Sequence, residues 1–401
     1  MVEPVALVRR ALQEIRAGYW FIPAALSVGA VALAAATWWI EAHLPTDLPL
    51  YDFRVEGARN LLTTIASAVL GVTGVMFSLT LVAVSHAAGK YGPRLIGNFM
   101  RDRGAQWSLG ILVGVFAYAM TTLVLTDGLD ERALRLPVLV AVALVAAALG
   151  TIIYYIHHVP ETMNVSNIAA GLGRRLRRMI REQIDGAEAR GRDAPWELPA
   201  RAPDVVVPAP EVGYVQAVGF ERLIDWAEEG GLHLHLHATP GDFVHPRRPL
   251  LSVWGAADAE AAGEVLAKAV ALGPEPTETQ PLTFLANQLV EMTGIALSPG
   301  VNDPFTAMTC LDWLSAALAE AICHEGGLRP LHRPRLVTRE LDFAELYAHT
   351  FPTAMPYVLG DPVATRRAIE LLEGLVALPG AADRRAMLAD LRKLRRSQRN
   401  S

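Results

Sequence analysis

Three histidines alternate along one predicted strand in the second half of the chain. His233, His235 and His237 are two residues apart, so their side chains point to the same face of that strand. Imidazoles at this spacing can bind zinc or nickel, or can form a patch whose charge follows pH. No Cys or Glu of fitting spacing accompanies them, and a solvent-facing strand explains the pattern equally well. We therefore expect no cofactor.

Three further histidines stand at the ends of apolar segments. His86 follows the segment 61–85, and His157 and His158 follow the segment 136–156. An unperturbed imidazole changes its charge near neutral pH, so these side chains are candidates for sensing cytoplasmic pH. The alternative is that they are histidines placed at a membrane interface without a sensing role.

Small and mildly polar residues form a stripe along one face of the second apolar segment. Its members recur at helical spacings of three and four: Asn60, Thr64, Ser67, Gly71, Gly74, Ser78 and Ser85. In lipid such a stripe allows helices to pack closely. Repeated around a symmetry axis, the same stripe can line a narrow aqueous pore. Both interpretations stay open at this point.

The string SPGVNDPFTA at 298–307 combines a helix break with several polar side chains. Pro299 and Gly300 end one predicted helix, and Asp303 and Pro304 suit the N-cap and first position of the next. Capping therefore explains much of the string. A functional interpretation instead places four side chains around a ligand or across a subunit interface: Ser298, Asn302, Asp303 and Thr306.

The chain lacks the common catalytic and nucleotide-binding motifs. It has no Walker loop, dinucleotide-binding glycines, HExxH, nucleophile elbow or Cys-x-x-Cys pair. We therefore predict that it is not an enzyme, and we assign no catalytic residue. Its formal net charge is −5, and its basic residues lie beside apolar segments, so we expect no nucleic-acid partner.

The elements that position these residues begin with four uncharged apolar segments. Segments 19–40, 61–85, 107–126 and 136–156 contain no Asp, Glu, Lys or Arg. Each reaches roughly the 20 residues that a helix needs to cross the hydrocarbon core of a bilayer. The sequence therefore predicts a multi-pass membrane protein. Since no ionisable carboxylate, Lys or Arg lies within a span, passive flow or no flow is favoured over active transport.

The charges between the segments predict the orientation. Arginines and lysines gather before the first segment, between the second and third, and after the fourth, while the other two connections are acidic. Basic loops stay in the cytoplasm, so both termini are predicted to be cytoplasmic, with the protein in the cell inner membrane. Two amphipathic stretches, 1–17 and 168–184, carry arginines that would attract anionic lipid at that face, or they pack as ordinary helices.

The predicted fold is an α-helical membrane domain with four transmembrane helices, followed by a cytoplasmic α+β domain with a small β-barrel-like unit and helices. Strands are expected at 212–218, 232–238 and 250–254, and helices at 221–229, 257–271, 282–297, 304–323, 361–376 and 382–397. The predicted order is an interfacial helix at 1–17, the transmembrane domain at 18–160, a basic juxtamembrane helix at 161–192, a Pro-rich connector at 193–212, the β-containing unit at 213–256 and a mainly helical domain at 257–401.

Several strings of the chain resemble one family over nearly its whole length. They are HAAGKYGPRLIGNFMRDRGAQWSLG at 86–110, IHHVPETMNVSNI at 156–168, GYVQAV at 213–218, PGDFV at 240–244 and ALSPGVNDPFTA at 296–307. Together they resemble the bacterial predicted membrane proteins grouped as domain of unknown function 2254. The helix before the last string departs from the family's pattern. The resemblance implies an inner-membrane location and a shared architecture, and it brings no catalytic residues.

These observations leave two functional hypotheses. In the first, the protein is a homo-oligomeric channel-like protein that passes ions or small solutes under the control of its cytoplasmic domain. In the second, it is a membrane-anchored scaffold or sensor that binds a cytoplasmic partner or ligand and has no pore. The feature that separates them is whether the stripe faces a common axis or the other helices of its own subunit.

Overall fold

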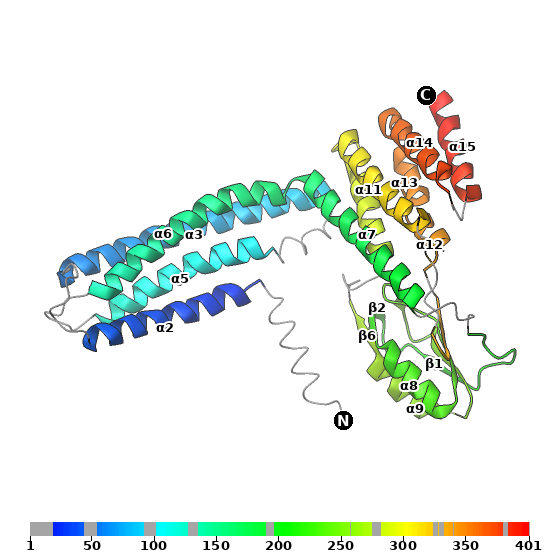
Figure 1. The fold of residues 1–401 in the computed structure, drawn as a ribbon, viewed down its shortest axis with the longest axis horizontal. Helices are drawn as coiled ribbons and strands as arrows, with labels where there is room; N and C mark the ends of the chain where they lie inside the picture. Colours follow the sequence, from blue (N-terminus) through cyan, green and yellow to red (C-terminus); the bar gives the residue numbers. More distant parts are fainter. Residues whose placement is uncertain are drawn as a thin grey trace. The chain divides into compact units, whose positions relative to one another are not determined.

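The computed structural model describes residues 19–43, 54–91, 102–126, 135–189, 196–256, 258–274, 282–323, 328, 333–339, 341–379 and 384–400 (Figure 1). The chain divides into two compact units, Met1–Asn167 and Ile168–Ser401. The interfacial helix predicted at 1–17 lies outside the described residues. N-terminal apolar helices followed by a mixed helix and sheet unit agree with the predicted fold class.

The first unit is a bundle of long apolar helices. They are α2 (Phe21–His43), α3 (Val55–Tyr91), α5 (Arg103–Leu125) and α6 (Arg135–Thr162), which cover the four apolar segments. Helix α5 is central and packs against the other three. A Cβ at Gly110 would lie 2.7 Å from Leu26 Cδ1 and 3.2 Å from Pro23 Cα. Glycine at this position therefore allows α2 to approach α5 closely.

Charged side chains fasten the helix ends of this bundle to one another. Arg59 on α3 donates from Nη2 to the backbone carbonyl of Thr126, at the C-cap of α5 (2.8 Å). The carboxylate of Glu41 on α2 accepts a hydrogen bond from the backbone N–H of Leu136, in the first turn of α6 (2.8 Å). Both contacts satisfy backbone groups that a helix end leaves without an intrahelical partner. They also place each charge where the helix dipole favours it.

The second unit begins with α7 (Val165–Ala189), whose apolar side is buried. Leu172, Leu176, Ile180 and Ile184 are each at most 5% exposed. The predicted amphipathic stretch is therefore a helix that packs on protein through its apolar face. Arg174, Arg175 and Arg178 are exposed on this helix.

Two separate small sheets form the β-containing part. One has the order β1 (Val205–Pro208), β5 (Pro249–Trp254), β3 (His233–Leu236) and β7 (Leu336–Thr338); the other has the order β4 (Phe243–Val244), β2 (Gly213–Val218) and β6 (Val270–Gly273). Strands β1, β5 and β3 are antiparallel neighbours, and β7 runs parallel to β3. Strand β1 lies within the range predicted as a Pro-rich connector.

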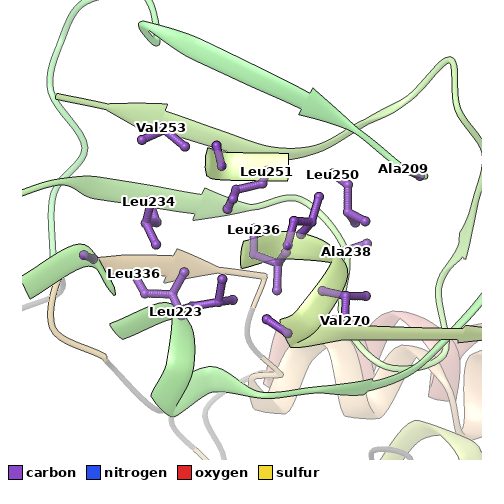
Figure 2. Packing of buried hydrophobic residues seen from close by; sticks show 14 of the residues in the cluster. Ala209, Leu223, Leu234, Leu236, Ala238, Leu250, Leu251, Val253, Val270 and Leu336 are labelled. Carbon is purple, nitrogen blue, oxygen red and sulfur yellow. The ribbon is translucent and has the colours of Figure 1, made fainter. Parts of the chain in front are cut away.

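The expectation of a β-barrel-like unit is wrong, because no closed barrel forms from the described strands. Strand β2 pairs with β4 and β6, and β3 pairs with β5 and β7, so neither sheet continues into the other. Helices α8 (Phe220–Gly230) and α9 (Ala259–Ala269) contribute side chains to the apolar core between them and the strands, where a barrel would have only strands. Figure 2 shows Leu223 of α8 near Leu336 of β7, with Leu234 and Leu236 of β3 in the same cluster.

The rest of the second unit is helical. It comprises α10 (Leu282–Ala296), α11 (Pro304–Cys323), α12 (Phe343–Ala348), α13 (Phe351–Val358), α14 (Pro362–Ala377) and α15 (Arg384–Asn400). The helices predicted at 257–271, 282–297, 304–323, 361–376 and 382–397 are confirmed within a few residues at their ends. Helices α12 and α13 and strands β1, β4, β6 and β7 were not predicted.

Among the described residues, five helices are long and apolar enough to cross a membrane. They are α2, residues 55–86 of α3, α5, α6 and α11. This assignment rests on length and composition, and it does not confirm the predicted number of four. Helix α11 differs in its surroundings, because it packs between other helices of the second unit, α10 and α14.

Candidate functional site

A polar cluster joins the start of α5 to the C-terminal part of α6. Asp102 is the N-cap of α5, and its carboxylate accepts hydrogen bonds from the backbone N–H groups of Gly104 (3.3 Å) and Ala105 (3.0 Å). The same carboxylate lies 2.8 Å from Nε2 of His158 on α6. The other ring nitrogen, Nδ1, is 3.2 Å from the hydroxyl of Tyr154, whose ring stacks on the imidazole. Both nitrogens of His158 are therefore engaged.

The cluster has partners for either charge state of the imidazole. A neutral ring donates from Nε2 to Asp102 and accepts at Nδ1 from the Tyr154 hydroxyl. A charged ring donates from both nitrogens, and a phenol oxygen can accept as well as donate. The side chains of Asp102 and His158 are about one-fifth exposed.

The backbone at Gly104 must come close to the imidazole for this contact to form. A Cβ at position 104 would lie 2.2 Å from Nε2 of His158 and 2.7 Å from the hydroxyl of Tyr154. Any other residue would therefore displace the ring. Glycine at this position is required by the His158–Asp102 contact itself.

A small pocket lies next to this cluster. It has room for about one water molecule, and Tyr19, Thr80, Ala105 and Tyr155 contribute to its lining. The hydroxyls of Thr80 and Tyr155 share a hydrogen bond within it. Ala105 follows Gly104 and Tyr155 follows Tyr154, so the pocket adjoins the cluster on both helices.

The structure distinguishes the three histidines predicted at segment ends. Only His158 has an acidic partner among the described residues. His157 is exposed, with its Nδ1 atom 3.2 Å from the carbonyl of Ile153 on its own helix, and His86 is exposed on α3. His158 is thus the one of these three with an acidic partner in the described part of the chain, and a pH-sensing role stays a prediction.

The stripe on α3 faces away from the rest of its own bundle. All seven of its members are exposed on the surface of the single chain. A Cβ built at Gly71 or Gly74 would meet nothing within 4 Å. The packed side of α3 is formed instead by a set of buried residues: Ala58, Leu62, Ile65, Ala66, Val69, Thr73 and Met76.

The two sides of α3 are almost diametrically opposed. Ser67 follows buried Ile65 by two residues, and Gly71 follows buried Val69 in the same way. Two residues of an α-helix correspond to a rotation of about 200°. The subunit's own packing on α3 therefore does not use the stripe, whereas the glycine pattern on α5 is used for packing against α2.

The three alternating histidines do share one side of β3, but each has a protein contact. His233 Nδ1 accepts a hydrogen bond from Nε1 of Trp196 (3.0 Å), and His237 Nε2 lies 2.8 Å from the hydroxyl of Ser252. The rings of His235 and His237 are 4.0 Å apart between centroids. Burial lowers the pKa of both His235 and His237 below the usual value of 6.5. In the described parts of the chain, no group of three or more His, Cys, Asp or Glu is placed to hold a metal ion.

The string at 298–307 forms the turn between α10 and α11. Asp303 caps α11 by accepting from the backbone N–H (3.1 Å) and hydroxyl (2.6 Å) of Thr306, and the Ser298 hydroxyl donates to the Ile295 carbonyl (2.6 Å). Asn302 has a positive φ of 50° and is exposed. The backbone N–H of Asn302 donates to the Ser298 carbonyl (2.9 Å), so all four candidate residues make local contacts that build the turn.

Two arginines of α7 are held by one acid on α11. Arg177 Nη2 lies 2.7 Å from Glu320 Oε2, and Arg181 Nε lies 2.5 Å from Glu320 Oε1. The hydrogen bond from Arg181, with a further one from Arg177, lowers the pKa of Glu320 from 4.5 to about 2. These two cations are therefore engaged within the unit, and Arg178 stays exposed on the same helix.

Comparison with known proteins identifies the family of this chain. The family described as Predicted membrane protein (DUF2254) matches residues 16–374, which is most of the chain. The chain belongs to this family. An uncharacterized protein of Mycobacterium tuberculosis (strain CDC 1551 / Oshkosh) is 25% identical over 318 residues, covering 76% of this chain and 60% of the relative. An uncharacterized protein of Mycobacterium bovis (strain ATCC BAA-935 / AF2122/97) has the same identity and coverage.

The chain spans about 60% of the length of these curated relatives. No solved structure matches. Two of the strings that resemble the DUF2254 family, at 86–110 and 156–168, supply the central contact of the polar cluster. The first contains Asp102 and Gly104, and the second contains His158.

Sequence reasoning missed Asp102, Gly104 and Tyr154. The available signal was an Asp followed two residues later by a Gly at the start of an apolar helix, which indicates an N-cap. Nothing in the spacing connects this N-cap to a histidine 56 residues further along the chain.

Proposed function

We propose that the protein is an oligomeric, channel-like protein of the inner membrane, in which the α3 stripes of several copies face a shared axis. The observation that carries this proposal is the exposure of the whole stripe on the side of α3 opposite its own bundle. A small and polar surface gains little from lipid, and it packs favourably against a like surface of another copy.

The stripe has the chemistry that a narrow pore requires. Asn60, Ser67 and Ser78 present an amide and two hydroxyls along one side of α3, and Gly71 and Gly74 expose backbone between them. Polar groups without full charges can replace part of an ion's hydration without trapping it. A single bundle of four helices encloses little space, so the pore has to form between copies.

The proposed topology has four transmembrane helices, α2, α3, α5 and α6, with both termini in the cytoplasm. Helix α11 is assigned to the cytoplasmic domain because two acids along it are paired with protein arginines. Asp312 accepts from Nε of Arg367 on α14 (2.8 Å), and Glu320 binds Arg177 and Arg181 on α7. Carboxylates at these two positions oppose insertion of the helix into a hydrocarbon core.

The decisive experiment measures ion flux through the purified protein in liposomes, at about pH 5.5 and about pH 7.5. In Gly74→Leu, the new side chain meets open space in the subunit, so the bundle should fold while the pore is blocked. The matched control is Val75→Leu, since Val75 is 60% exposed on a neighbouring part of the same helix. We expect flux in the natural protein and the control, and its loss in Gly74→Leu.

The second hypothesis, a scaffold or sensor, uses the same stripe as a packing seam without a pore. It predicts no flux from a well-folded oligomer, and dissociation of that oligomer in Gly74→Leu. Measuring the mass of the detergent-solubilised complex beside the flux therefore separates the two. Flux that survives Gly74→Leu unchanged contradicts the proposed pore.

A further inference from the structure

The cations of the C-terminal helix α15 divide into two sets. In the first set, Lys393 lies 3.0 Å from Asp390 and Arg395 lies 2.6 Å from Glu373 of α14. Arg384 donates to the carbonyl of Leu378 (3.1 Å). Arg395 and Arg384 therefore attach α15 to α14 and the turn after it, whereas Lys393 is paired within α15 itself.

The second set forms an exposed basic ridge along α15, defined by Arg385, Arg392, Arg396 and Arg399. All four are exposed, and none has an acidic partner in the part of the chain that the structure describes. They are separated by seven, four and three residues, so at about 100° per residue they lie on one side of the helix. The apolar residues Met387, Leu391 and Leu394 are buried on the other side.

Helix α8 carries an exposed ridge of the opposite charge, defined by Glu221, Asp225, Glu228 and Glu229. These acids too are exposed and make no ion pair within the described residues. The opposite side of α8 is buried through Leu223 and Ala227, so the acids must face outward. Helix α8 packs beside strands β3 and β7, whereas α15 packs on α14 (Figure 1).

The two ridges share one spacing. Glu221, Asp225 and Glu228 recur at intervals of four and three residues, and Arg392, Arg396 and Arg399 recur at the same intervals. Side chains at these positions of two facing helices can therefore form several ion pairs at once, in a single register.

We infer that the basic ridge of α15 docks on the acidic ridge of α8 in a second copy of the chain. The contact joins two different surfaces, so it is heterologous, and it closes into a ring when the copies are arranged around one axis. This inference rests on the proposed function, which supplies such an axis through α3. Exposed ion pairs are individually weak, but copies already held together in a membrane meet at a high effective concentration.

Anionic lipid is the other surface that could attract the basic ridge. The apolar side of α15 is buried in its own domain, so the helix has nothing to insert among acyl chains and would contact headgroups by charge alone. A lipid surface also leaves the acidic ridge of α8, with its matching spacing, without a role. The second copy accounts for both ridges.

The test uses charge reversal with a disulfide as the readout. In a Cys323→Ser background of the full chain in native membranes, Glu228→Cys and Arg399→Cys are introduced together and mild oxidation is applied. Cys310 is buried and is retained. We expect cross-linked multimers.

Reversing the charges of either ridge should lower the cross-linked fraction about tenfold. The basic ridge is reversed by Arg392→Glu with Arg396→Glu, and the acidic ridge by Glu221→Arg with Asp225→Arg. Combining both reversals should restore the cross-linked fraction.

Restoration by the combined variant also shows that the reversed chains still fold. The matched control is Glu260→Arg, an exposed acid on α9 outside the ridge, which should leave the cross-link unchanged. One result would overturn the inference in favour of lipid or another acidic partner. In that result, reversing the charges of α15 abolishes the cross-link, reversing those of α8 has no effect, and the combined variant does not restore it.

A separate Ser78→Cys cross-link on α3 shows whether the oligomer itself exists. If that one forms and the ridge cross-link does not, only the present inference fails.

Discussion

His158 Nε2 lies 2.8 Å from the carboxylate of Asp102, and this contact fastens the C-terminal part of α6 to the first turn of α5. The same carboxylate caps α5, so one side chain performs two tasks. Loss of the Asp102 carboxylate would therefore remove the cap of α5 and its connection to α6 together.

Gly104→Ala should weaken this connection. The added Cβ would lie 2.2 Å from His158 Nε2, so the ring must move and its hydrogen bond to Asp102 is lost. We expect a loss of stability of about 1–3 kcal/mol for the first unit, measured by thermal unfolding of the purified protein in detergent. The control is Gly150→Ala on α6, where a Cβ meets nothing within 4 Å and no loss is expected. Equal effects of the two variants would contradict the tight approach at Gly104.

The two glycine patterns of the bundle should respond differently to a large side chain. Gly110→Leu would place atoms against Leu26 and Pro23, so α2 and α5 cannot pack and the folded subunit should be lost. Gly74→Leu should leave the subunit folded and change only what happens between copies. Thermal unfolding reports the first effect, and the mass of the solubilised complex reports the second. If Gly74→Leu unfolded the subunit, the outward placement of the stripe would be wrong.

Glu320→Gln should reduce the stability of the second unit at neutral pH. Hydrogen bonds from Arg181 and Arg177 hold the pKa of Glu320 at about 2, below its ordinary 4.5. Its contribution is therefore present above about pH 4.5 and is lost as the pH falls towards 2. We expect Glu320→Gln to cost about 1–2 kcal/mol at pH 7, with a smaller difference at about pH 3, in denaturant titrations. Glu373→Gln, in a more exposed ion pair, should cost less than about 0.5 kcal/mol.

Acidification should destabilise the second unit through β3. Burial lowers the pKa of His235 and His237, with a further lowering from His237 for His235 and from Arg248 for His237. The unfolded chain therefore takes up protons first, and stability falls as the pH drops below about 6.5. Replacing both residues with Gln should flatten the stability between about pH 7.5 and pH 5 in thermal unfolding.

The two cysteines provide a test of folding and topology. Cys310 is buried, and burial raises the pKa of its thiol to about 12, whereas Cys323 is exposed. We expect a maleimide to label Cys323 alone in the folded protein and both thiols after denaturation. A membrane-impermeant reagent should reach Cys323 only from the cytoplasmic side of oriented vesicles. Labelling from the opposite side would contradict the proposed orientation.

The long helices were predictable because their signals are local. The start of the helix at 304–323 follows from Asp303 as its cap and Pro304 as its first residue, and the four apolar segments follow from composition alone. The sheets were predictable only as individual strands. Which strands pair depends on residues far apart in sequence, and the three-residue β7 joins β3 across about 100 residues. A barrel was inferred where two separate sheets form.

The candidate site was predictable only in part for the same reason. The stripe on α3 and His158 could be named from spacing and position. The partner of His158 could not be named, because Asp102 approaches it through tertiary packing that depends on Gly104. The alternation of His233, His235 and His237 correctly indicated one strand face, but the sequence does not show that Trp196 and Ser252 contact two of those rings.

Helix α11 has a consequence for how the chain is made. It is apolar enough for the membrane-insertion machinery to recognise, and α14, which covers one of its sides, emerges from the ribosome about 40 residues later. During that interval Asp312 and Glu320 are the features that keep the helix out of the bilayer under the proposed topology. If both acids were neutralised, some newly made chains would insert α11 into the bilayer and misfold during synthesis, before the stability of the folded state matters.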